Sequence, residues 1–139
     1  MNLMKVRRAL VIGCGEFGAA VADALSDAGF SVTVIDKTAS AFNALSAGFG
    51  GERVTDDGAN VAVLEDCEIG KAELLVACTE RDSVNYFVAR VASEVYGVEH
   101  VFARIEDEDL VAMLEDSVVE PICPHVLCLG EFRRRAKIG

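Results

Sequence analysis

Short apolar runs alternate along the chain with longer segments in which apolar residues recur at helical spacing. The runs are continuous rather than alternating, which is typical of strands covered on both faces of a parallel sheet. The sequence predicts six such strands, at residues 9–12, 31–35, 53–55, 73–78, 100–105 and 118–122.

The segments between the strands predict helices. Segment 16–28 places Phe17, Val21, Ala24, Leu25 and Ala28 at helical spacing, and Gly29 follows as a stop signal. The clearest stripe belongs to segment 82–96 and consists of Val84, Phe87, Val88, Val91, Ala92 and Val95. Asp82 is the expected N-cap of that helix. Weaker helices are expected at 38–47, around 61–67 and at 106–114.

Strict alternation of strands and helices predicts one α/β domain, a doubly wound parallel six-stranded sheet of the Rossmann type with strand order 3-2-1-4-5-6. We expect this domain to occupy residues 1–125, and residues 126–139 to form a C-terminal helix or tail with no second domain.

Composition narrows the class of protein. With 139 residues, 52% of them apolar, the chain can bury a core. A net charge of −10 disfavours nucleic acid as a partner, because a phosphate backbone requires a basic surface. The apolar run after the N-terminal basic residues is too short for a signal peptide, and no run reaches the roughly 18 residues of a membrane span. We therefore expect a soluble, cytoplasmic protein.

Five cysteines form no C-x-x-C pair. Cys123, His125 and Cys128 offer three zinc ligands, but a structural zinc site usually has four. We therefore expect packed, reduced cysteines and no metal site.

A glycine turn, Gly13-Cys14-Gly15-Glu16-Phe17-Gly18, follows the first strand and opens the first helix. In a dinucleotide-binding turn the first glycine permits the tight bend, the second lets a pyrophosphate approach, and the third allows close packing of the helix. The helix N-terminus then attracts the phosphates.

Asp36 ends the second strand, where a carboxylate can accept hydrogen bonds from both ribose hydroxyls. We expect it to have no packing role. Its charge favours NAD(H) or an adenosine nucleotide such as ADP or ATP over NADP(H), although the adjacent Lys37 softens this preference. Glu16 would compete with bound phosphate, more strongly for a triphosphate, and therefore favours NAD(H) weakly.

The sequence beyond Asp36 resembles the nucleotide-binding N-domain of Trk/Ktr potassium-transport regulators, also called the KTN or RCK N-domain. The family's G-D-A-T-type turn is matched by Asp56-Asp57-Gly58-Ala59, and its V-x-T-x-x-D-x-x-N stretch by residues 76–85. Its A-R-[VI] strand end is matched by Ala103-Arg104-Ile105. The resemblance extends from about Lys5 to about His125.

This resemblance implies roles for individual residues. Asp57 and Gly58 would line the adenine side of the pocket, and Thr79 would lie by the phosphates or the distal ribose. Arg104 would either approach the ligand or form an ordinary ion pair at its strand end. Two departures limit the transfer. Glu16 stands where ATP-binding members often carry a basic residue, and His125 stands where some carry a metal-binding glutamate.

The resemblance also implies a function: a cytoplasmic regulatory subunit that senses NAD(H), or ADP/ATP, and gates a membrane potassium channel or transporter. Such regulators assemble as homodimers or rings and are peripheral to the membrane through their partner. The basic cluster 133–137 could contact an anionic membrane face, although a solvated linker is the better interpretation. Two alternatives stay open, a small NAD-dependent oxidoreductase or a subunit of one, and a domain that binds nothing. Because the chain has no evident catalytic set, we do not expect an enzyme.

Overall fold

The computed structural model describes residues 5–139, so the first four residues of the expected domain 1–125 lie outside the described residues. Six strands form one parallel sheet in the order β3-β2-β1-β4-β5-β6, which confirms the predicted topology. The strands are β1 (Arg8–Ile12), β2 (Ser31–Asp36), β3 (Glu52–Thr55), β4 (Leu74–Ala77), β5 (His100–Arg104) and β6 (Glu120–Ile122).

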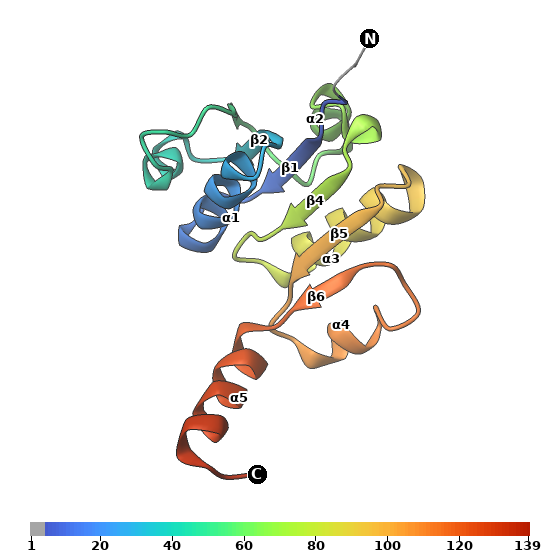
Figure 1. Cartoon of the computed structure of the whole chain (residues 1–139). Helices are drawn as coiled ribbons and strands as arrows, with labels where there is room; N and C mark the ends of the chain where they lie inside the picture. The colour runs from blue at the N-terminus through green and yellow to red at the C-terminus, as the bar shows by residue number, and fades with distance from the viewer. Residues whose placement is uncertain (1–4) are drawn as a thin grey trace.

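Helical segments connect the strands and cover both faces of the sheet (Figure 1). The α-helices are α1 (Glu16–Asp27), α2 (Val61–Asp66), α3 (Asp82–Arg90), α4 (Glu108–Ala112) and α5 (Pro124–Ala136). The remaining helical segments are the 3₁₀ turns η1 (Ala39–Ala44) and η2 (Ile69–Lys71), and the π-helical turn η3 (Val91–Val95) that continues α3. None of the helices in residues 5–139 combines the length and the hydrophobicity that a membrane span requires.

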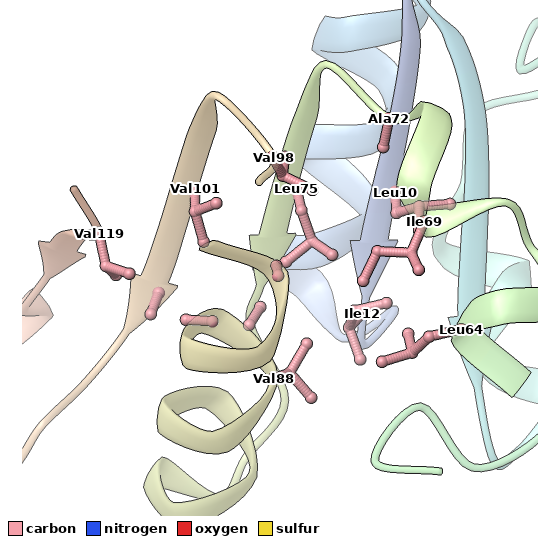
Figure 2. Packing of buried hydrophobic residues seen from close by; sticks show 14 of the residues in the cluster. Leu10, Ile12, Leu64, Ile69, Ala72, Leu75, Val88, Val98, Val101 and Val119 are labelled. Carbon is pink, nitrogen blue, oxygen red and sulfur yellow. The ribbon is translucent and has the colours of Figure 1, made fainter. Parts of the chain in front are cut away.

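The hydrophobic core has two halves, one on each face of the sheet, because successive strand residues point to opposite faces. Leu10 and Ile12 of β1 join the half that also contains residues of α2 and α3. Figure 2 shows this half, with Leu64 and Val88 directed toward the sheet. Ala9 and Val11 of β1 point the other way and pack with Ala19 and Ala22 of α1.

The buried face of α1 differs from the predicted stripe. The buried residues are Gly18, Ala19 and Ala22, whereas Phe17 is 38% exposed. Small residues are required here because α1 begins close against the sheet: a Cβ atom on Gly18 would lie 2.0 Å from the carbonyl oxygen of Gly13. Val21 and Leu25 of the predicted stripe do pack against the core, but the prediction missed the small residues at which the helix makes its closest approach.

The predicted stripe of α3 is only partly buried. Val88 and Ala92 lie in the core as expected, and Asn85 is buried beside them, whereas Phe87 and Val95 are 44% and 69% exposed. Asp82 is not the N-cap, since Arg81 occupies that position. The Asp82 carboxylate instead accepts hydrogen bonds from the backbone N–H groups of Glu106, at 3.1 Å, and Asp107, at 2.8 Å. It therefore joins the start of α3 to the loop after β5.

Removal of a large side chain from the centre of the sheet tests this packing. Leu75 of β4 is fully buried, whereas Leu127 of α5 is 63% exposed. We expect Leu75→Ala to lower the free energy of unfolding by about 2–5 kcal/mol, because it leaves a cavity. We expect Leu127→Ala to change it by less than about 0.5 kcal/mol. Urea denaturation followed by circular dichroism measures both, and equal effects would contradict the assigned core.

Candidate functional site

A cavity of about 950 Å³ opens at the carboxyl ends of the strands. Its lining comes from the glycine turn after β1, the ends of β2 and β4, the loop after β3, Arg104 of β5 and the start of α5. In an open α/β sheet ligands bind at this edge, where the strand order reverses between β1 and β4. The cavity therefore lies where the topology predicts a ligand site.

Eleven of the twelve predicted site residues line this one cavity. They are Gly13, Gly15, Glu16, Phe17, Gly18, Asp36, Lys37, Asp57, Gly58, Thr79 and Arg104. The exception is Cys14, whose side chain is buried in the core beneath the turn. Cys14 reaches the site only through its backbone, because its N–H donates to the Asp36 carboxylate at 2.8 Å.

The three glycines of the turn meet different surroundings. Gly13 has φ of +102°, and a Cβ there would lie 2.9 Å from the backbone of Cys78 and Thr79. Gly18 has no room for a Cβ, as described above, so these two glycines allow β1, β4 and α1 to pack closely. A Cβ on Gly15 would meet nothing within 4 Å. Gly15 is therefore the glycine whose free space faces the cavity rather than the protein.

Asp36 has a structural role that the sequence analysis excluded, and that expectation was wrong. One carboxylate oxygen accepts from the N–H of Cys14 and the other from the N–H of Thr38, both at 2.8 Å. Asp36 thereby fastens the glycine turn to the end of β2. A carboxylate has about four lone-pair positions, so each oxygen can still accept one further hydrogen bond from a ligand.

The loop after β3 closes the cavity beside Asp36. Lys37 and Asp57 lie 3.9 Å apart, an exposed ion pair that contributes little to stability. Gly58 is buried, and a Cβ on it would lie 2.4 Å from a methyl carbon of Ile12. Its lack of a side chain therefore brings this loop against β1, in addition to lining the cavity.

On the other side of the glycine turn, Asn85 holds the ends of β4 and β5 together. Among residues 5–139 it is the only buried polar side chain, at 1% exposure. Its amide oxygen accepts from the backbone N–H of Thr79 at 2.8 Å and from the Thr79 hydroxyl at 2.7 Å. Its amide nitrogen donates to the carbonyl oxygens of Thr79 at 3.0 Å and Arg104 at 2.8 Å.

Sequence reasoning did not assign Asn85 or Asp82 to the site, although both stand in the D-x-x-N part of the quoted motif. The sequence signal that could have identified Asn85 is its position, because this asparagine is in register with the apolar stripe of its helix. A side chain buried at such a position must be fully hydrogen-bonded. The start of α5, which adds Pro124, Leu127 and Cys128 to the cavity, was missed as well.

The guanidinium group of Arg104 lies 3.4 Å from a carboxylate oxygen of Glu106. Arg104 thus forms an ion pair at its strand end, which was one expectation. It also lines the cavity, which agrees with the other expectation, an approach to the ligand. Arg81 lines the same end. The positive charges of the cavity are therefore split between Lys37 at one end and two arginines at the other.

The buried thiols near the turn are poor nucleophiles. Burial raises the pKa of Cys78 to about 12. The pKa of Cys14 is also raised, first by burial and then by the negative charge of Asp36. Since the thiolate is the reactive form, neither cysteine is reactive at neutral pH. Within the described residues, no group of three or more His, Cys, Asp or Glu is arranged to hold a metal ion.

Comparison with known proteins identifies relatives of this chain. The family model of the TrkA-N domain matches residues 9–123. The Trk system potassium uptake protein TrkA of Streptomyces coelicolor is 42% identical over 98 residues, which cover 70% of this chain and 44% of that protein. The chain thus spans less than half the length of this relative.

Solved structures share the fold. The TrkA-N domain of the Escherichia coli inner membrane protein ybaL superposes with a TM-score of 0.79 at 16% identity, covering 95% of this chain and 98% of that one. The Shewanella denitrificans Kef CTD in its AMP-bound form gives a TM-score of 0.78 at 19% identity, covering 94% and 79%.

Alanine substitutions at two glycines of the turn distinguish a role in packing from a role in the approach of a ligand. We expect Gly18→Ala to lower the free energy of unfolding by about 3 kcal/mol or more, because its Cβ overlaps a backbone oxygen. Gly15→Ala should cost only about 1 kcal/mol, since its φ of −71° suits alanine. If Gly15 admits a pyrophosphate, Gly15→Ala should also weaken nucleotide binding at least about tenfold. Denaturation and calorimetric titration measure the two effects, and an unchanged affinity would contradict the ligand role of Gly15.

Asn85→Ala removes four hydrogen bonds at once from a buried position. We expect it to lower the free energy of unfolding by about 3 kcal/mol, because backbone groups of Thr79 and Arg104 lose their partner. Asn60→Ala is the matched control, since the exposed Asn60 only caps α2 and should cost about 1 kcal/mol. The same denaturation experiment compares them, and equal losses would show that the buried amide is dispensable.

Proposed function

The chain belongs to the TrkA-N domain family, and on that premise we propose that it is a nucleotide-binding regulatory domain of a Trk-type potassium uptake system. The observation that carries the proposal is the single cavity that gathers the glycine turn, Asp36, Thr79 and Arg104. The 42% identity to a Trk system potassium uptake protein supports the link to potassium transport.

The ligand we propose is NAD(H), with ADP or ATP as the alternatives within the same site. The cavity continues from the end of β2 and the loop after β3, across the glycine turn, to Arg104 and Ile122. A dinucleotide has two sugars to place on the two sides of its pyrophosphate, and this extent favours it over a mononucleotide. Glu16, exposed in the first turn of α1, opposes the additional charge of a triphosphate.

The output we propose is binding rather than turnover. A ligand that prefers one conformation of the domain shifts the population toward it, and that shift is sufficient to act on a partner. We propose as that partner a membrane potassium transporter or channel subunit, with the domain on the cytoplasmic side and assembled with further copies of itself.

Thermal unfolding with NAD, NADH, ADP, ATP and NADPH tests the proposal. A ligand at about a hundredfold excess over its Kd should stabilise the fold by about 2.7 kcal/mol. We expect the largest shift with NAD or NADH. NADPH should give a smaller one, because its 2′-phosphate would face the Asp36 carboxylate. NADH absorbance should stay constant when carbonyl compounds are added.

Asp36→Asn should weaken NADH binding about tenfold by replacing a charged acceptor with a neutral one. The matched control is Asp27→Asn, at the exposed end of α1, which should leave the shift unchanged. If no nucleotide raises the unfolding temperature of the wild-type chain, the proposed function is wrong.

A further inference from the structure

Thr79 lines the cavity, and the surroundings of its hydroxyl group fix which way the hydroxyl hydrogen points. Its oxygen lies 2.7 Å from the amide oxygen of Asn85 and 3.3 Å from the carbonyl oxygen of Arg81. Both of these atoms can only accept a hydrogen bond. The Thr79 hydroxyl must therefore act as the donor to one of them, and the Asn85 oxygen is the closer.

The amide of Asn85 cannot be turned around to change this result. The atom assigned as its nitrogen lies within 3.0 Å of two backbone carbonyl oxygens, those of Thr79 and Arg104. The atom assigned as its oxygen lies 2.8 Å from the backbone N–H of Thr79. Exchanging the two would set an oxygen against two carbonyls and an NH₂ group against an N–H. The network consequently determines the orientation of the amide.

The acceptor side of the Thr79 hydroxyl is only partly used. The backbone N–H of Arg81 donates to it at 3.2 Å, which occupies one of its two lone pairs. What Thr79 can offer to a ligand is the remaining lone pair. A phosphate oxygen is also an acceptor, so it gains no hydrogen bond there.

From this polarity we propose that Thr79 accepts a hydrogen bond from a hydroxyl of the ligand's second sugar, and thereby selects dinucleotide-type ligands over nucleoside diphosphates. This inference rests on the proposed function, and it chooses the distal ribose over the phosphates as the neighbour of Thr79. Asn85 is a positioning residue in this arrangement, because it orients the Thr79 hydroxyl and holds the backbone of Thr79 and Arg104.

The order of groups across the sheet identifies the second sugar as the donor. Asp36 ends β2, the glycine turn follows β1, and Thr79 follows β4, so the three sites lie on adjacent strands. Neighbouring strands are about 4.8 Å apart, which places Asp36 and Thr79 roughly 10 Å from each other across the turn. A ligand with its first ribose at Asp36 and its pyrophosphate at the turn presents its second ribose next.

The test compares ADP with ADP-ribose, which differ by the second sugar, in calorimetric titrations of the full chain. We expect wild type to bind ADP-ribose about fivefold more tightly than ADP, as one hydrogen bond of ordinary strength provides. Thr79→Ser keeps the hydroxyl and should keep this ratio. Thr79→Val removes the hydroxyl and should bring the ratio to about one, because the affinity for ADP-ribose should fall by more than the affinity for ADP.

Thr79→Val leaves Asn85 its bond from the backbone N–H, so we expect the variant to fold, and Thr79→Ala replaces it if it does not. A wild-type ratio near one overturns the inference, as does an equal loss of affinity for both ligands in the variant. Equal loss is the result expected if Thr79 serves the diphosphate or only the fold. Failure of wild type to bind ADP, ADP-ribose or NADH would overturn the proposed function itself, and the inference with it.

Discussion

The close approach of α1 to the sheet is the constraint on which the rest of the site depends. Gly13 and Gly18 leave no space for a side chain, and a Cβ on either would lie within 3.0 Å of backbone atoms. This contact directs the first N–H groups of α1 toward the carboxyl edge of the sheet, where the helix dipole favours a negative charge. Asp36 completes the arrangement by holding the backbone of Cys14 and Thr38. The turn is thus fixed by contacts within the chain itself.

A second constraint acts on the opposite side of the switch point. Asn85 makes four hydrogen bonds from a buried position, and Asp82 of the same helix binds the backbone of Glu106 and Asp107. The first turn of α3 therefore holds the ends of β4 and β5 together. A buried amide is stabilising only when all of its hydrogen bonds are made. The loops that carry Thr79 and Arg104 consequently move as one unit or at the expense of this network.

The fold was predictable because its evidence is distributed along the chain. Six apolar runs with helices between them permit few topologies, and the predicted strand order is the observed one. The clustering of the site residues followed from the glycine turn and from strand ends that meet at one edge. The faces of α1 and α3 were less predictable. Hydrophobic periodicity weights large residues, whereas the faces that approach the sheet most closely carry Gly18, Ala22 and Asn85. Neither small size nor complete hydrogen bonding is visible in a pattern of hydrophobicity.

The same limit explains why the direction of the hydrogen bonds at Thr79 could be determined only from the structure. The sequence placed Thr79 at the end of β4, but a threonine hydroxyl both donates and accepts, so its position alone leaves its ligand open. The contacts of Asn85 remove that ambiguity, since its oxygen and the Arg81 carbonyl compete for the single hydrogen of the hydroxyl. Asp36, which can only accept, lies at the opposite side of the turn. Asp36 and Thr79 thus present acceptors on the two sides of the turn, with the positive end of α1 between them, and this order matches two sugars that flank a pyrophosphate.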